Sequence, residues 1–150
     1  MSSGLVLDRL EIEVTETALL NEEHDAIGDL RRLRDMGVRV ALDDFGTGYS
    51  SLAHLRAFPF DKIKIDGSFV KDAVERPDCA AVVRAIADLG KSLGVTTVAE
   101  GVETQAHFDR VKKEGCIEVQ GYFFSRPMPS ENDAAIVTEL NNKRTRVARP

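Results

Sequence analysis

Two hydrophobic patterns alternate along the chain. Short apolar runs rich in β-branched residues predict strands, and stretches in which apolar residues recur every three or four positions predict amphipathic helices. The expected strands cover residues 9–14, 38–43, 61–66, 95–100 and 117–121. The expected helices cover residues 25–37, 50–58, 67–75, 77–94 and 104–115. A glycine or a proline marks several of the helix ends, as at Gly37, Pro77 and Gly94.

Strands that alternate with helices of this length predict βα units, in which the strands form a parallel sheet. The 150 residues are enough for one domain. We therefore expect an α/β fold with about five parallel strands. The end of the chain, NNKRTRVARP, is polar and basic, which is typical of a flexible tail and would also suit a weak contact with an acidic partner.

The residue composition and net charge argue against some classes of function for this chain. Hydrophobic residues make up 43% and charged residues 30% of the chain, which is ordinary for a globular domain. The net charge of -5 argues against binding to a nucleic acid polymer.

No apolar run approaches the roughly 18 residues of a membrane span, so no membrane contact is evident. The first residues, MSSGLVLDRL, lack the pattern of an export signal. The spacing of Cys79 and Cys116 does not fit a metal site, so we expect two reduced thiols and a cytoplasmic location.

A polar or charged side chain lies at or near the carboxyl end of every expected strand. These residues are Glu13, Asp43, Lys64, Glu100 and Gln120, with Asp44 directly after Asp43. Because a parallel sheet is covered on both faces, solvation does not explain polar residues at all five strand ends. The carboxyl ends of the strands are also where parallel βα folds assemble their sites. We therefore expect these side chains to converge on one pocket.

The expected pocket has a surplus of negative charge. Its four carboxylates, from Glu13, Asp43, Asp44 and Glu100, face the single positive charge of Lys64, which leaves a net charge of -3. Carboxylate and amide oxygens suit Mg²⁺, Mn²⁺ or Ca²⁺, and the lack of His and Cys argues against a structural zinc site. Two ions held by adjacent aspartates could activate water and clamp the oxygens of an in-line phosphoryl displacement. The glycines of FGTGYS allow a tight turn beside the pocket, or they form only a βα turn.

Five segments in this order resemble the carboxyl-terminal part of the EAL domain: LEIEVTE, ALDDFGTGYSSL, DKIKIDGSFV, VAEGVE and QGYFFSRPMP. The resemblance implies a modified TIM barrel that hydrolyses the bacterial second messenger cyclic di-GMP to the linear dinucleotide pGpG. It covers residues 5–130. We expect a terminal helix over residues 131–140 and a flexible basic tail over residues 141–150.

The resemblance also implies roles for individual residues. The implied metal ligands of a two-metal site for Mg²⁺ or Mn²⁺ are Glu13, Asp43 and Asp44, and the implied catalytic residues are Lys64, Glu100 and Gln120. Glu16 resembles the glutamate that anchors the glycine-rich loop of residues 45–52, which in the family links metal occupancy to dimerisation. A charge at a helix N-terminus is the alternative for Glu16. Glu103 resembles a residue near a guanine base, or it is a first-turn charge of the next helix.

Some parts of the family pattern do not occur in these 150 residues. The Glu-Ala-Leu segment, the arginine that follows it and the asparagine of an Asn-Leu-Ser strand are missing, and two of these residues bind metal in the family. Because a complete (β/α)8 barrel takes roughly 250 residues, we expect a partial TIM-type barrel of about five strands with two open edges. We expect the sheet to close by self-association as a homo-oligomer, by rearrangement, or against the N-terminal part of the barrel.

The expected function is that of the C-terminal part of a metal-dependent cyclic di-GMP phosphodiesterase, without turnover by the isolated chain because metal ligands are missing. The alternative is a non-catalytic cyclic di-GMP-binding, dimerisation or regulatory module of bacterial signalling. A response-regulator receiver domain also combines paired acids with a strand-end lysine. In receivers, however, two more strands intervene, whereas Lys64 ends the strand that directly follows Asp43 and Asp44.

Overall fold

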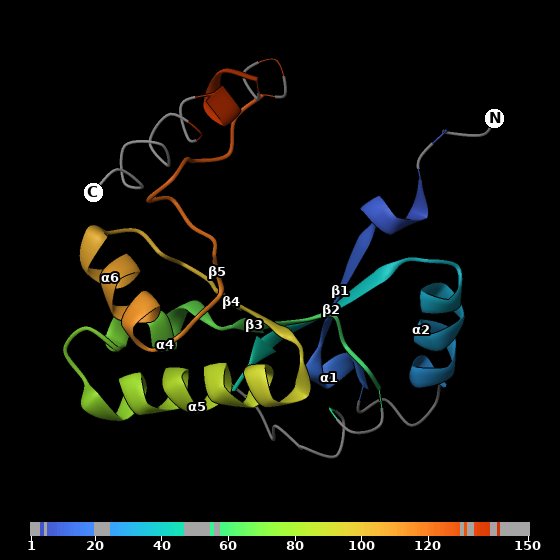
Figure 1. Cartoon of the computed structure of the whole chain (residues 1–150), viewed down its shortest axis with the longest axis horizontal. Coiled ribbons are helices and arrows are strands. Elements are labelled where there is room, and N and C mark those ends of the chain that lie inside the picture. Colours follow the sequence, from blue (N-terminus) through green and yellow to red (C-terminus); the bar gives the residue numbers. More distant parts are fainter. Residues whose placement is uncertain are drawn as a thin grey trace.

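A computed structural model describes residues 4, 6–19, 25–46, 55, 58–129, 131, 134–138 and 141. Within this part of the chain, five strands form one sheet in the order of the sequence, and every neighbouring pair is parallel (Figure 1). The strands are β1 (Glu11–Thr15), β2 (Arg39–Phe45), β3 (Lys62–Ile65), β4 (Thr96–Ala99) and β5 (Glu118–Val119). The predicted α/β fold with five parallel strands is therefore confirmed.

Helices connect the strands, as the hydrophobic periodicity predicts. They are the 3-10 helix η1 (Leu7–Arg9) and the α-helices α1 (Glu16–Leu19), α2 (Ala26–Asp35), α4 (Gly67–Asp72), α5 (Pro77–Leu93) and α6 (Gln105–Lys113). Local chemistry fixes several of their ends. The side chain of Asp25 accepts a hydrogen bond from the Gly28 N–H at the start of α2, and Thr104 accepts one from the His107 N–H at the start of α6. The left-handed φ of 71° at Gly94 ends α5.

The core lies between the sheet and the helices. The side chains of Val40, Leu42, Ile63 and Ile65 are buried and pack in one apolar cluster with Val83 of α5. Figure 1 shows α5 running along one side of the strands. Since successive side chains of a strand point to opposite faces, the residues between these apolar positions project from the other face of the sheet.

Some predicted boundaries and faces differ from the structure. Met36 and Leu93, apolar residues at helical spacing, are 60% and 47% exposed; Met36 directly follows α2, and Leu93 is the last residue of α5. The helix expected over residues 50–58 falls mostly outside the described residues, with Leu55 alone described as helical. Residues 134–138 are helical, within the expected terminal helix, and the tail after residue 141 also lies outside the description.

Two further sequence predictions concern cysteines and membranes. Cys79 and Cys116 are both free thiols, as expected. In the described part of the chain, no helix is both long enough and apolar enough to cross a bilayer.

Candidate functional site

The ammonium group of Lys64 lies at the centre of a cluster of carboxylates from three other strands. Its Nζ atom is 2.8 Å from Glu13 Oε1 on β1, 3.0 Å from Asp43 Oδ1 on β2 and 2.8 Å from Glu100 Oε1, which directly follows β4. The Lys64 side chain is only 6% exposed, whereas the Glu13 side chain is 47% exposed. The side chains of Glu13, Asp43, Lys64 and Glu100 therefore meet at the carboxyl ends of the strands, as the sequence predicts.

A β-bulge brings Asp43 and Asp44 to the same point. In the pairing of β2 with β3, Leu42 lies opposite Ile63 and Phe45 opposite Ile65, so the two aspartates face the single residue Lys64. Asp44 has a left-handed φ of 54°, which is uncommon for a residue with a side chain. In a regular strand the two side chains would point to opposite faces, and the bulge removes this separation.

The carboxylates of Asp43, Asp44 and Glu100 form a compact group of oxygen donors. One oxygen from each lies within 4.8 Å of the other two. Burial raises the pKa of Asp44, and the negative charges of Asp43 and Asp66 raise it further. Burial also raises the pKa of Glu100, although hydrogen bonding to Lys64 opposes this effect. Crowded carboxylate oxygens are the donors that a hard divalent cation prefers, and its charge would offset the raised pKa values of Asp44 and Glu100, so the residues present fit such an ion.

The backbone holds Glu100 beside Lys64 through a close contact of two glycines. The N–H of Glu100 donates a hydrogen bond to the Ile65 carbonyl at 3.1 Å. The next residue, Gly101, has a φ of +63°, and a Cβ there would lie 3.2 Å from the Cα of Gly67. The segments after β3 and β4 therefore touch through their backbones, which fixes the distance between the two ion-pair partners.

A second group of charges lies nearer the amino ends of the strands and joins β1, β3 and β5. Lys62 Nζ is 3.3 Å from Glu11 Oε2 and 3.1 Å from Glu118 Oε2. Lys62 precedes Lys64 by two residues, so the two lysines project from the same face of β3. The sequence carries no signal for the partners of Lys62, because Glu11 and Glu118 lie on strands far from it along the chain.

The remaining predicted site residues are placed around this cluster. Gln120 directly follows β5, and its N–H donates a hydrogen bond to the Ala99 carbonyl at 2.9 Å, which puts it beside the end of β4. Its side chain is exposed and has no hydrogen-bond partner among the described residues. Glu103 Oε1 instead lies 3.1 Å from Lys71 Nζ on α4, at the surface. Glu103 precedes Thr104, the N-cap of α6, so it is not a first-turn charge of that helix and this alternative is wrong. The approach of Glu103 to a guanine base stays a prediction.

The glycine-rich loop is described only at its start. Gly46 has a φ of +103°, and a Cβ there would lie 3.1 Å from Phe69 Cε2 on α4. Residues 47–52 of the predicted loop, and the side chain of Glu16 at the start of α1, lie outside the described part of the structure. The predicted role of Glu16 as a loop anchor stays a prediction.

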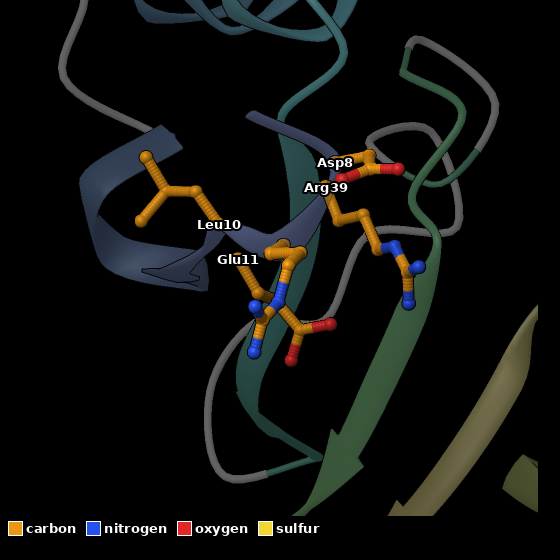
Figure 2. A pocket seen from close by; sticks show the side chains of 5 residues that line it. Asp8, Leu10, Glu11 and Arg39 are labelled. Atoms are coloured by element: carbon orange, nitrogen blue, oxygen red, sulfur yellow. The ribbon is translucent and has the colours of Figure 1, made fainter. Parts of the chain in front are cut away.

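A surface hollow at the opposite end of the strands does not coincide with this cluster. Figure 2 shows it between the first residues of β1 and β2, where Asp8, Arg9, Leu10, Glu11 and Arg39 line it. The hollow lies at the amino ends of the strands, whereas the cluster around Lys64 lies at their carboxyl ends. In βα barrels the reacting groups come from the carboxyl ends, so we assign no function to the hollow.

Comparison with known proteins identifies the architecture. Residues 1–127 match the family model described as "EAL domain". Among curated proteins, the cyclic di-GMP phosphodiesterase NbdA of Pseudomonas aeruginosa is 45% identical over 127 residues, which is 85% of this chain but 16% of NbdA. The chain therefore spans only a small share of the length of this relative.

Solved structures agree with this result. The PaMucR phosphodiesterase in complex with c-di-GMP superposes with a TM-score of 0.79 at 41% identity, over 85% of this chain and 52% of that one. Klebsiella pneumoniae BlrP1, in a complex with manganese and c-di-GMP, superposes with a TM-score of 0.78 at 40% identity, over 83% of this chain and 32% of BlrP1. These similarities agree with the predicted partial barrel.

Proposed function

Because this chain belongs to the EAL domain family, we propose that it is the carboxyl-terminal part of a cyclic di-GMP phosphodiesterase and supplies half of the active site. The observation that carries the proposal is the convergence of Glu13, Asp43 and Glu100 on Lys64, at 2.8 to 3.0 Å from its Nζ. This acidic cluster lies where βα folds place their sites, and its oxygen donors suit manganese, the metal of the BlrP1 complex.

We infer that Glu13, Asp43 and Asp44 hold Mg²⁺ or Mn²⁺, with Glu100 close enough to share an ion. The oxygens of Asp43, Asp44 and Glu100 lie within 4.8 Å of one another, which supports this assignment. When bound, the cations supply positive charge to the phosphodiester oxygens and acidify a nearby water. The carboxylates around Lys64 carry more negative charge than its ammonium group neutralises, and this excess would attract the cations.

The chain's own residues would orient the attacking water and take its proton. Once a bound cation takes up part of the carboxylate charge around it, Lys64 would have a donor free for the water and would steady the negative charge that develops on the phosphate. Glu100 accepts the proton, and its raised pKa makes it a better base near neutral pH than an ordinary carboxylate. Gln120 hydrogen-bonds the water from the end of β5. In-line attack on phosphorus then breaks the bond to one bridging ribose oxygen, which takes up a proton and leaves as a hydroxyl group, and the product is pGpG.

The proposal includes two contacts outside the cluster. Glu103, held at 3.1 Å from Lys71, is proposed to approach a guanine base. Glu16 is proposed to anchor the loop of residues 45–52. The protein would act in the cytoplasm, where a bacterial second messenger is found.

Turnover is expected to require residues that this chain does not contain. It has no Glu-Ala-Leu segment. It also spans 52% or less of the solved chains reported above. We expect the amino-terminal half of an EAL domain, or a second copy of the chain, to complete the barrel.

The test is conversion of cyclic di-GMP to pGpG in the presence of Mn²⁺, followed by chromatography. The chain is assayed alone and after refolding with a polypeptide that supplies the Glu-Ala-Leu half of the domain. We expect activity only in the second sample, and we expect it to disappear with Lys64→Met but to survive Lys62→Met. Absence of pGpG from the complemented chain would contradict the proposed activity.

A non-catalytic cyclic di-GMP-binding or dimerisation module is the second candidate. The missing Glu-Ala-Leu segment favours it, because a ligand-binding module does not need the complete set of metal ligands. Calorimetric titration with cyclic di-GMP distinguishes the two candidates. Tight binding by the complemented chain without any pGpG would favour the second one.

A further inference from the structure

The ammonium group of Lys64 uses all three of its N–H donors on carboxylates. The acceptors are Glu13 at 2.8 Å, Asp43 at 3.0 Å and Glu100 at 2.8 Å. The Lys64 side chain is 6% exposed, so the ammonium group cannot replace these contacts with water without moving. Lys64 is thus already the counter-ion of the acidic cluster.

Two of the three partners of Lys64 also belong to the compact donor group. Asp43 and Glu100, together with Asp44, bring one oxygen each to within 4.8 Å of one another. A divalent cation bound by this group would therefore draw on carboxylate charge that Lys64 also uses. The ammonium group and the cation would repel each other at close range.

We propose that Lys64 is a built-in competitor of the divalent cation, which lowers the cation affinity of the site and replaces the cation as counter-ion when divalent ions are scarce. The inference rests on the cation site of the proposed function and adds a regulatory property to it. It predicts opposite effects for two neighbours in the cluster. Removal of Asp43 weakens cation binding, whereas removal of the Lys64 charge tightens it.

Lys62 provides the matched control. It projects from the same face of the same strand, also pairs with two carboxylates, Glu11 and Glu118, and shares neither of them with the donor group. Lys62→Met therefore removes one positive charge from nearly the same place without removing a direct competitor. A purely long-range effect of net charge would be similar in both variants.

The experiment is Mn²⁺ titration calorimetry on the 150-residue chain and its Lys64→Met and Lys62→Met variants, after circular dichroism has verified folding. We expect Lys64→Met to bind Mn²⁺ about tenfold more tightly than the unmodified chain, and Lys62→Met to change affinity by less than about threefold. The inference is overturned if the unmodified chain binds Mn²⁺ and Lys64→Met binds it no more tightly. If none of the three proteins binds Mn²⁺, the proposed cation site fails, and the inference fails with it.

A second measurement keeps the inference testable if Lys64→Met does not fold. In the unmodified chain labelled with ¹⁵N-lysine, NMR can follow the ammonium groups of Lys62 and Lys64 during titration with diamagnetic Mg²⁺. We expect the Lys64 signal to shift and its hydrogen exchange to accelerate as its carboxylates are taken up, while the Lys62 signal stays unchanged. An unchanged Lys64 signal at saturating Mg²⁺ would overturn the inference.

Discussion

The N–H of Asp44 donates a hydrogen bond to the carboxylate of Asp43 at 3.1 Å. It does so while Asp44 holds a φ of 54°, in the left-handed region that most residues with side chains avoid. Aspartate tolerates this region better than most residues do, because its short side chain can hydrogen-bond locally. This conformation belongs to the bulge, which brings the carboxylates of Asp43 and Asp44 close to that of Glu100.

Two substitutions of Asp44 should distinguish how its backbone conformation and how its charge affect the stability of the chain. Asp44→Asn keeps the tolerance for a left-handed φ and removes the repulsion by Asp43, so we expect it to be at least as stable as the unmodified chain. Asp44→Ala should be about 1 kcal/mol less stable than Asp44→Asn, because alanine does not share this tolerance. Urea unfolding measures the difference.

The same two variants test the proposed ligand role of Asp44. Both should bind Mn²⁺ at least about tenfold more weakly in titration calorimetry, because each loses one anionic donor. Asp29→Asn, at an exposed ion pair on α2, serves as the control and should leave the affinity unchanged. Wild-type affinity in Asp44→Asn would show that Asp44 is not a ligand.

Glu114 is a buried charge remote from the proposed site. Its side chain is 0% exposed, and its carboxylate lies 2.6 Å from Arg84 Nη2 of α5 and 3.3 Å from Arg110 Nη1 of α6. Burial opposes ionisation of Glu114, but the hydrogen bonds from Arg84 and Arg110 outweigh it and hold the pKa below its ordinary value of 4.5. The ionised carboxylate therefore joins two helices.

The pH dependence of this interaction follows from the direction of the shift. A carboxyl group with a lowered folded-state pKa adds stability that is present above its ordinary value of 4.5 and is lost as the pH falls through the folded-state pKa. Glu114→Gln should therefore cost about 2 kcal/mol at pH 7, and the difference from the unmodified chain should narrow below pH 4.5. Urea unfolding at several pH values measures both. A difference independent of pH would mean that the charge of Glu114 adds no stability.

Thr97 of β4 has a buried hydroxyl without a hydrogen-bond partner among the described residues. Its Cγ2 packs so closely against α5 that a Cβ on Gly90 would lie 2.4 Å away. Thr97→Val keeps this methyl contact and removes the unsatisfied oxygen, so it should stabilise the chain by about 1 kcal/mol. Thr97→Ser, which keeps the hydroxyl and loses the methyl group, should destabilise it. A less stable Thr97→Val in urea unfolding would indicate a partner for the hydroxyl.

The sequence predicted the features that depend on local chemistry or on a regular period. Gly37, Pro77 and Gly94 marked helix ends correctly because each residue type satisfies a backbone requirement at that position. The positions of Asp43 and Lys64 at strand ends followed from alternation and from the rule that parallel strands end together. The convergence of charged side chains on one point was therefore predictable without any distance.

Features that depend on tertiary distances were not predictable in this way. An alternating pattern carries no sign of an extra residue, so the bulge at Asp43 and Asp44 was missed. The pairing of Glu103 with Lys71 joins segments of the chain that no periodicity links. β5 is shorter than expected, at Glu118–Val119, because strand length is set by the partner strand and not by β-propensity alone.

The last prediction concerns the two edges of the sheet. Within the described residues, β1 and β5 each pair with one strand only, and each has an exposed apolar residue directly before its start. Leu10 is 37% exposed and Ile117 is 63% exposed. Unpaired strand edges next to apolar side chains favour pairing with another chain.

We therefore expect the chain to form dimers or larger assemblies, measured by size-exclusion chromatography with light scattering. Lysines at strand edges oppose such pairing, so the double variant Leu10→Lys and Ile117→Lys should shift the distribution toward monomer. Leu93→Lys alters a residue that is 47% exposed at the end of α5, the helix that connects the inner strands β3 and β4, and should leave the distribution unchanged. The edges would not drive assembly if the unmodified chain were a monomer with cooperative unfolding, or if Leu93→Lys dissociated it as effectively as the double variant.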